Sequence, residues 1–211
     1  MSPAAPSPRS RVHRAAERAH YDSATVHAIV DAAWLCHVAF AAPDPVCIPT
    51  ACWRVGDHLY IHGSPGSRMM AHLGSGAPAC VSITHLDGLV LARSAFAHSM
   101  NYRSVVIHGA FGVVAGPDKV AALDAFMDHL VPGRRPMLRP HHTRELDATT
   151  VLRLPLQEAA AKIRNWGPKD KEADLDAPVW AGVLPLRAQH LPPQAEPSSP
   201  VAPEHVRHWA Q

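Results

Sequence analysis

The feature that most constrains the fold is a change in hydrophobic period at Trp34. Before it, apolar residues recur at i, i+3, i+4 and i+7, which predicts one amphipathic helix. These residues are Val26, Ile29, Val30 and Ala33. After Trp34, apolar and polar residues alternate, as in strands with one buried face. Because no repeating strand–helix–strand pattern follows, we expect a mainly β fold with peripheral helices, an antiparallel barrel rather than a doubly wound sheet.

Turn-forming residues divide the alternating region into separate strands. The expected strands are 34–40, 46–54, 58–62, 79–85, 89–92, 102–114 and 148–156. Asp87-Gly88 is a frequent hairpin turn, so it predicts that the segments on either side of it pair with each other. Ser67–Leu73 predicts a short helix that ends at Gly74, and Pro117 suits the first position of another helix.

The length of 211 residues fits one domain with extensions. Residues 1–20 are rich in Pro, Ser and Arg and predict a flexible N-terminal segment. Residues 21–187 hold the alternating strands and form the expected folded domain. Residues 188–211 contain five prolines between Leu191 and Pro203. They predict a tail that is disordered or lies on a neighbouring subunit.

Composition excludes several classes of partner. Hydrophobic residues make up 47% of the chain, so a sizeable core is available. The net charge of +2 is too balanced to indicate nucleic-acid binding by bulk electrostatics. No apolar run approaches the ~20 residues that span a bilayer. The N-terminus has no apolar core of a secretory signal, so we expect a cytoplasmic protein without a membrane partner.

Cysteine and histidine provide no metal-binding pattern. The four cysteines form no Cys-x-x-Cys pair and lie in apolar stretches, which is typical of reduced, buried thiols. They are Cys36, Cys47, Cys52 and Cys80. The sixteen histidines are scattered, and none belongs to a His-Glu-x-x-His motif or a Cys–His set at zinc spacing. We therefore expect no metal site.

The clearest chemical signal is the segment Leu59–Leu73, where a strand ends at a Gly-Ser-Pro-Gly turn and a short helix begins. Helix N-termini offer free N–H donors, and glycines let the backbone approach a ligand closely. Ser64 and Ser67 add hydroxyls, and Arg68 adds a planar cation suited to phosphate. This pattern predicts a monophosphate site. An ordinary strand–turn–helix with a solvated Arg68 is the alternative, since neither the Walker nor the dinucleotide glycine spacing is present.

Longer blocks of sequence on both sides of this segment add a family resemblance. The blocks are Ala19-His20-Tyr21-Asp22, Cys36-His37-Val38-Ala39-Phe40, Ile48-Pro49-Thr50, Leu59-Tyr60-Ile61-His62-Gly63-Ser64, Thr84-His85-Leu86-Asp87-Gly88-Leu89-Val90-Leu91-Ala92-Arg93-Ser94, Ser99-Met100-Asn101-Tyr102-Arg103-Ser104-Val105-Val106 and Pro178-Val179-Trp180-Ala181-Gly182-Val183. Residues 18–186 resemble the flavin-nucleotide-binding branch of the pyridoxamine 5′-phosphate oxidase-like superfamily. They are also similar to nitroimidazole-resistance proteins, which share the Ile-Pro and His-Gly layout.

The resemblance implies a six-stranded antiparallel split β-barrel that forms a homodimer with FMN at the subunit interface. Ile48, Pro49 and Thr50 would lie beside the isoalloxazine ring. The segment Ile61–Met70 would hold the ribityl chain and phosphate. The cofactor-binding residues implied there are Ile61, His62, Gly63, Ser64, Ser67, Arg68 and Met69. Many relatives have Lys where this chain has Met69, so the phosphate would meet one cation fewer.

A second polar cluster contains Asn101, Tyr102, Arg103 and Ser104. We expect this cluster to contact the flavin that is bound mainly by the partner subunit. Tyr102 would stack on the flavin ring, and Arg103 would stabilise a reduced, anionic flavin. The alternative is an interface salt-bridge network without cofactor contact. His62 is the one candidate catalytic residue, as a proton donor beside the flavin. The alternative for His62 is a packed strand histidine.

These features predict an FMN-dependent oxidoreductase that acts on an unidentified small molecule. Pyridoxal synthesis is not implied, since no second phosphate pocket of clustered Arg and Lys is evident in the sequence. Three alternatives remain open: a haem-binding or haem-degrading split-barrel protein, a flavin carrier or sensor without turnover, and binding of a deazaflavin in the same groove.

Overall fold

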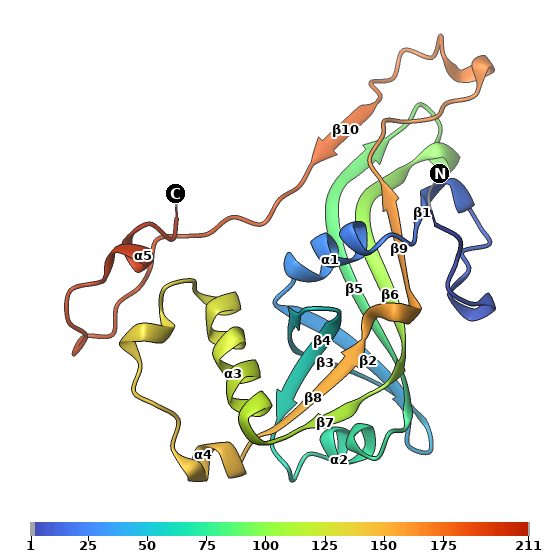
Figure 1. Ribbon diagram of the computed structural model, residues 1–211. Helices are drawn as coiled ribbons and strands as arrows, with labels where there is room; N and C mark the ends of the chain where they lie inside the picture. Colours follow the sequence, from blue (N-terminus) through green and yellow to red (C-terminus); the bar gives the residue numbers. More distant parts are fainter. Residues whose placement is uncertain (1–2, 211) are drawn as a thin grey trace.

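The computed structural model describes residues 3–210, and a single antiparallel sheet dominates it (Figure 1). Its strands are β1 Ala19–His20, β2 Leu35–Ala41, β3 Pro45–Val55, β4 His58–Gly63, β5 Pro78–Leu91, β6 Ser99–Ala110, β7 Gly112–Val114, β8 Thr150–Pro155, β9 Ala159–Arg164 and β10 Gly182–Pro185. The strand order is β1-β9-β6-β5-β2-β3-β4-β8-β7, with β10 paired to β5. The sheet has ten strands and is not closed. The expected antiparallel split barrel is confirmed, with ten strands in place of six, and the short strands β1, β7 and β10 are three of the four additional ones.

Helices lie at the periphery of the sheet. They are α1 Ser23–Asp31, α2 Arg68–Gly74, α3 Gly116–Leu130, α4 Thr143–Asp147 and α5 Glu204–Arg207. The expected helices before Trp34, after Ser67 and at Pro117 are confirmed by α1, α2 and α3. Among residues 3–210, no helix combines the length and apolar character needed to cross a membrane.

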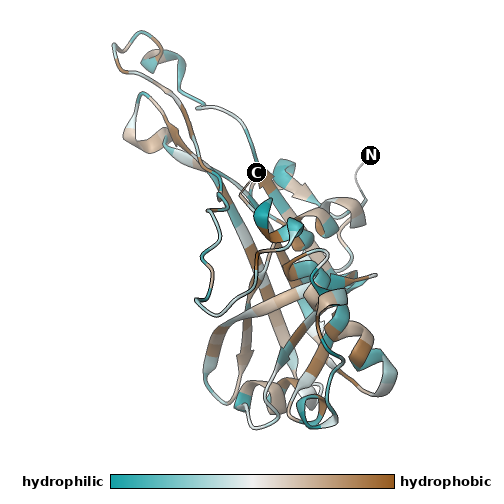
Figure 2. Ribbon diagram, turned by 90° about the vertical axis from the view of Figure 1, so that its left-hand side faces the viewer, coloured by the Kyte–Doolittle hydropathy of each residue, from teal (hydrophilic) through white to brown (hydrophobic). Residues whose placement is uncertain are grey.

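The core lies on both faces of β4. Leu59 and Ile61 point into the barrel, where α1 adds Ile29 and Val30 to the same buried cluster. Their neighbour Tyr60 points to the other face and packs with Trp53, Ala122 and Leu123 under α3. Full burial of one such aliphatic side chain contributes roughly 1.5–3 kcal/mol. Figure 2 shows the apolar residues running along the long strands.

The barrel splits where β3 leaves β4. These strands pair only from Cys52–Ile61 to Val55–His58. The first part of β3, from Pro45 to Ala51, pairs with β2 alone, so its other edge has no partner in β4. Proline suits such an edge because it lacks an N–H donor for a ladder. The strand therefore carries Pro45 and Pro49 where no neighbouring strand needs their amides.

The expected hairpin at Asp87-Gly88 is wrong. β5 runs straight through these residues and remains paired with β6, with a β-bulge between Leu86 and Gly88. A bulge absorbs an extra residue without ending the strand. Gly88 is needed for close approach of β10, because a Cβ there would lie 3.0 Å from the carbonyl oxygen of Leu184.

The expected left-handed end of α2 at Gly74 is also displaced. The helix includes Gly74, and the residue with positive φ is Gly76, at 82°. Glycine adopts a positive φ without strain, so Gly76, two residues after Gly74, can end the helix in this way.

Both terminal extensions contact the folded body. On the N-terminal side, the Ser7 hydroxyl and the Arg9 Nε both donate to the Glu158 carboxylate, at 2.7 and 3.0 Å. On the C-terminal side, His190 stacks on Trp209 with ring centroids 4.0 Å apart, and both rings lie against Trp34. The tail leaves β10 and crosses to the side of α3, where α5 lies (Figure 1). Residues 1, 2 and 211 of the two extensions lie outside the described residues.

The cap of α1 gives a pH-dependent prediction. The Asp22 carboxylate accepts a hydrogen bond from the Thr25 amide at 2.8 Å, and this bond lowers the pKa of Asp22. The stabilisation is therefore fully present above about pH 4 and is lost as the pH falls through the lower folded-state pKa. We expect Asp22→Ala to lower the free energy of unfolding at pH 7 by about 1 kcal/mol. Urea unfolding at pH 7 and at pH 3 measures the difference.

Asp22→Asn is the matched control for this cap, because asparagine caps a helix without titrating. We expect it to unfold like the wild type at pH 7 and to lose less stability on acidification. If the alanine variant matched the wild type at pH 7, the cap would contribute nothing.

The contact between α2 and β4 gives a second prediction. A Cβ at Gly63 would lie 2.9 Å from the Cγ of Met70, which is buried in the core. We expect Gly63→Ala to destabilise the protein by about 1–3 kcal/mol, the usual range for overpacking. At Gly66 the nearest atom to such a Cβ is the Ser64 Oγ, at 3.7 Å, so Gly66→Ala is the control. Equal melting temperatures for the two variants would contradict the close packing of α2.

Candidate functional site

The two predicted flavin-binding segments meet at the mouth where β3 and β4 separate. The last pair between these strands is Cys52–Ile61. Beyond it, the chain of β4 continues through His62 to Gly63, while β3 carries Thr50 on the other side of the split. The structure therefore brings Ile48–Thr50 and the start of Ile61–Met70 to one opening of the barrel.

Hydrogen-bond donors gather on the α2 side of this mouth. Ser67 caps α2, and its hydroxyl oxygen accepts from the Met70 amide at 3.4 Å. The amides of Arg68 and Met69 begin the helix and have no partner within it. The Arg68 side chain is exposed, and the described residues include no carboxylate paired with it. This end of α2 thus has two amides and one cation available to an anion.

The turn before α2 shapes the approach to these donors. The Ser64 carbonyl accepts from the Ser67 amide at 2.9 Å, and the Ser64 hydroxyl oxygen accepts from the Gly66 amide at 3.2 Å. The turn is exposed, so the Ser64 O–H can still donate outward. Met69 differs, because its side chain is buried in the core. Of Met69, only the main chain is placed to bind a phosphate.

On the β3 side, main-chain groups line the mouth. The Cys52 amide bonds to the Trp34 carbonyl, so alternate residues of β3 direct their main-chain groups to β2 and away from it. Ile48 and Thr50 lie four and two residues before Cys52, so their main-chain groups also point toward β2. The main-chain groups of Pro49 point to the open edge, where proline offers a carbonyl oxygen but no N–H. Ile48 also packs against the core. A ring at this edge would therefore meet chiefly main-chain oxygens.

His62 lies on the face of β4 that α3 covers. Its ring lies 4.7 Å from that of Phe126 and 5.6 Å from that of Trp53. The Nδ1 atom is buried and has no hydrogen-bond partner among the described residues. Burial lowers the pKa of His62, so the ring is neutral near pH 7. The packing explains the position of the ring, and its role as a proton donor stays a prediction.

The second predicted cluster lies elsewhere in the same chain. Asn101, Tyr102, Arg103 and Ser104 belong to β6, and β5 and β2 separate β6 from β3. Within one chain these four residues therefore lie on a different strand from those that form the mouth. Their contact with a flavin through a second copy stays a prediction.

Within the chain, the side chains of this cluster already have partners. Arg103 makes two hydrogen bonds of 2.9 Å to the Asp87 carboxylate. This pairing raises the pKa of Arg103 and offsets its charge. Asn101 is buried and accepts a hydrogen bond from Arg164. The sequence pattern did not reveal that Asp87 and Arg164 are the partners of Arg103 and Asn101. Asp87 was assigned to a turn, and Arg164 lies far away in the sequence.

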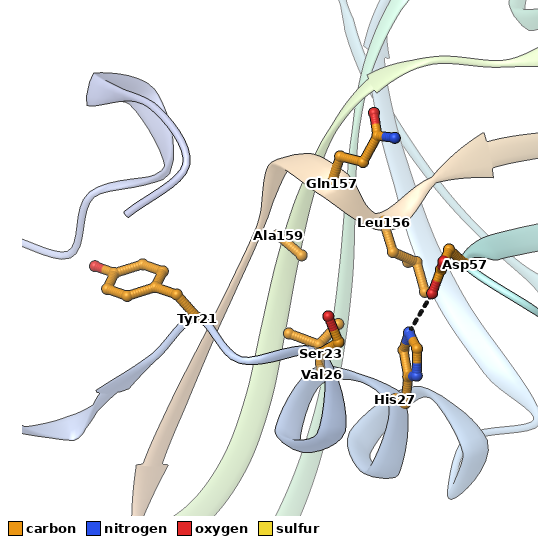
Figure 3. Close-up of a pocket in the computed structure, with 8 residues that line it drawn as sticks. All are labelled: Tyr21, Ser23, Val26, His27, Asp57, Leu156, Gln157 and Ala159. Atoms are coloured by element: carbon orange, nitrogen blue, oxygen red, sulfur yellow. Dashed lines mark ion pairs between the residues drawn. The ribbon is translucent and has the colours of Figure 1, made fainter. Parts of the chain in front are cut away.

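A separate hollow opens between α1 and the turn after β8 (Figure 3). It contains a His27–Asp57 ion pair of 3.2 Å. Its volume is about 160 Å³, which is below the roughly 300–1,000 Å³ of cofactor pockets. None of its lining residues belongs to the predicted flavin site.

Metal-binding groups are not clustered in the part of the chain that the structure describes. No set of three or more His, Cys, Asp or Glu residues there could hold a metal ion. The cysteines are unpaired, with Cys36 and Cys52 buried and Cys47 exposed. Contact with Cys52 and burial raise the pKa of the Cys36 thiol far above its usual range.

The donor set at the mouth fits a flavin phosphate. It combines helix-terminal amides, the Ser64 hydroxyl and an unpaired arginine with an open strand edge for a planar ring. The fit rests on groups that the described part of the protein leaves without partners. Haem requires an axial ligand, and neutral histidine is a common one. Histidines are abundant here, yet the geometry singles out none of them as that ligand.

Comparisons with known proteins identify the family to which this fold belongs. A family model for pyridoxamine 5′-phosphate oxidase matches residues 22–163. The flavocytochrome Anf3 from Azotobacter vinelandii is 41% identical, with a TM-score of 0.92 and 97% of each chain covered. A FAD and haem binding protein from Mycobacterium smegmatis is 38% identical, with a TM-score of 0.88, and the match covers 92% of this chain and 97% of that one.

A more distant structure shares the fold. It is a 5-nitroimidazole antibiotic resistance protein from Bacteroides thetaiotaomicron, described as putative by its authors, with 20% identity and a TM-score of 0.57 over 69% of this chain and 86% of that one. No curated protein sequence matches the chain. The family model and the two close structures agree with the split sheet and with the sequence resemblance. The chain belongs to the pyridoxamine 5′-phosphate oxidase family.

Proposed function

We propose that the protein binds a flavin at the mouth between β3 and β4 and acts as an oxidoreductase. The observation that carries this proposal is the 41% identity, over 97% of both chains, with a protein named as a flavocytochrome. The unpaired donors at the start of α2 support it independently, because a flavin phosphate needs such donors. A bound flavin would supply the electron-transfer chemistry, and the protein would bind and orient it.

Each side of the mouth has a distinct role in this proposal. Arg68, the amides of Arg68 and Met69 and the Ser64 hydroxyl hold the phosphate. The open edge beside Pro49 accepts hydrogen bonds from the ring. The site needs only the FMN portion of a flavin. Because FAD contains that portion, the FAD-binding relative from Mycobacterium smegmatis is compatible with the same site.

Haem binding alongside the flavin is the second candidate function. It is favoured by the names of both close relatives, which combine a flavin with haem or a cytochrome. The sequence alone suggested haem as an alternative to flavin, whereas these names favour both groups in one protein. A flavin carrier without turnover is the remaining alternative.

We also propose that the functional unit is a homodimer. Leu35 and Leu86 are exposed apolar side chains on the face of β2 and β5 that points away from the core. Burying them against a second copy would remove apolar surface from water. A second copy would also bring Tyr102 and Arg103 to a flavin at the mouth, as the sequence resemblance implies. The substrate would be a small molecule.

The flavin proposal predicts the visible spectrum and the effect of Arg68. We expect the purified protein to show flavin absorbance and to release FMN or FAD, identified by mass. Arg68→Ala should weaken flavin binding by roughly 1.5–3 kcal/mol, the range for hydrogen bonds to charged groups. Titration of the flavin-free protein, followed by flavin fluorescence, measures the loss.

Arg11→Ala is the control, because Arg11 is an exposed arginine of the N-terminal segment, which leads into β1 beside β9 rather than to α2. We expect it to bind flavin like the wild type. A protein that takes up no flavin would overturn the proposal. Unchanged affinity in Arg68→Ala would place the phosphate elsewhere. A Soret band beside the flavin peaks would support the second candidate function.

If the protein is a homodimer, analytical ultracentrifugation should show a species near twice the 22.8 kDa of one chain. Leu35→Glu should shift this species toward the monomer, because it would bury a charge in the interface. Leu175→Glu changes an exposed leucine outside the sheet and should leave the mass unchanged. If the wild-type protein bound flavin as a monomer, the shared-site proposal would fail.

A further inference from the structure

Arg164, at the end of β9, is a buried cation without a carboxylate partner. Its side chain is only 3% exposed. The guanidinium donates to the side-chain oxygen of Asn101 and to the carbonyls of Trp166 and Gly167, while its Nε has no partner. No ion pair to it exists among residues 3–210. A buried charge without a counter-charge is costly, so an anion bound beside this arginine would stabilise it.

A hollow of about 450 Å³ opens beside Arg164. Its lining contains five cationic side chains and no carboxylate. The cations are Arg14, Arg18, Lys162, Arg164 and Lys169. They come from the N-terminal segment, from β9 and from the loop after β9. We call this hollow the basic pocket.

The cations surround one aromatic ring. Trp166 has the charged groups of Arg18, Arg164 and Lys169 within 5.4 Å of its ring centroid. Cation–π contact holds these like charges close to one another. Burial, followed by the nearby charge of Arg18, lowers the pKa of Arg164. The cations of the pocket therefore repel one another, and a bound anion would reduce this repulsion.

The acidic groups nearest to the basic pocket do not neutralise it. Glu17 lies 3.6 Å from the Arg18 Nε but is itself well exposed. The Asp170 carboxylate pairs with Arg93 through contacts of 2.8 Å to its amide and guanidinium. Lys162 donates to the main-chain oxygen of Arg14, which is neutral. The surplus of positive charge therefore remains within the pocket.

The basic pocket is distinct from the mouth where the flavin is proposed. Ser99, which lines the pocket, begins β6, whereas α2 lies near the other end of the long β5–β6 pair (Figure 1). At about 3.3 Å per residue, β6 spans roughly 36 Å. One flavin cannot reach from α2 to Arg164 within a single chain.

We propose that the basic pocket binds the phosphate or diphosphate group of a phosphate ester. Two or more arginines match the forked geometry of phosphate oxygens, and several cations suit an anion of more than one charge. The volume exceeds that of a bare phosphate ion and leaves room for the first part of the ester. The same chemistry has two sources: a separate phosphorylated molecule, or the diphosphate of a FAD bound by the partner chain. The second source rests on the proposed function.

The probe for a separate ligand is inorganic pyrophosphate, followed by ADP, added to the protein as purified. Isothermal titration calorimetry measures binding, so the result does not depend on flavin absorbance. We test Arg14→Gln and Lys169→Gln, because both residues are exposed and their loss does not disturb the core. Each change should weaken binding by about tenfold or more, as expected for one hydrogen bond to a charged group. Arg144→Gln is the control with an equal loss of charge.

The outcomes separate the two sources. Saturable binding of pyrophosphate or ADP that both pocket variants weaken indicates a separate phosphate ester. No binding by the wild type, together with loss of FAD but not of FMN affinity in both variants, indicates the diphosphate of the flavin. If the wild type bound neither probe and both variants kept the FAD and FMN affinities of the wild type, the proposal would be overturned. If Arg144→Gln weakened probe binding as much as the pocket variants do, the binding would be general electrostatic attraction. That result would also overturn the proposal.

Discussion

The placement of β4 is the constraint on which the rest of the structure depends. Leu59 and Ile61 anchor it in the barrel core, while Tyr60 anchors it under α3. Its partners are β8 along its whole length and β3 along only part of it. Buried side chains on both faces fix β4, and β3 diverges from it beyond the Cys52–Ile61 pair. The candidate flavin site is the opening that this divergence leaves.

β4 also positions the helix that carries the proposed phosphate donors. The end of β4 carries Gly63, whose lack of a side chain lets the buried Met70 pack closely against the strand. That contact fixes α2, and α2 in turn presents the amides of Arg68 and Met69. A phosphate site of this kind needs no residue to move on binding, because the core already holds the helix. Destabilising the contact would therefore also disturb the donors at the start of α2.

Local patterns in the sequence predicted the helices and most of the strands, and they singled out the start of α2 as the candidate phosphate site. The helical spacing before Trp34 and the Ser67 cap depend on residues close in sequence, so α1 and α2 could be foreseen. The continuation of β5 through Asp87 could not, because it depends on pairing with β6 and on β10 crossing Gly88. The pairing of Arg103 with Asp87 was missed for the same reason. Long-range strand pairing decides such contacts, and no local pattern encodes it.

The basic pocket shows why composition can mislead about charge. A net charge of +2 indicates no anionic partner when it is averaged over the chain. Yet the fold draws Arg14 and Arg18 against Lys162 and Arg164, because β1 pairs with the end of β9. Nearly 150 residues of chain separate the two pairs. A second phosphate pocket was discounted for want of clustered Arg and Lys in the sequence, and the clustering exists only in three dimensions. Pairing of a two-residue strand is thus sufficient to create an anion site that neither motif nor composition reveals.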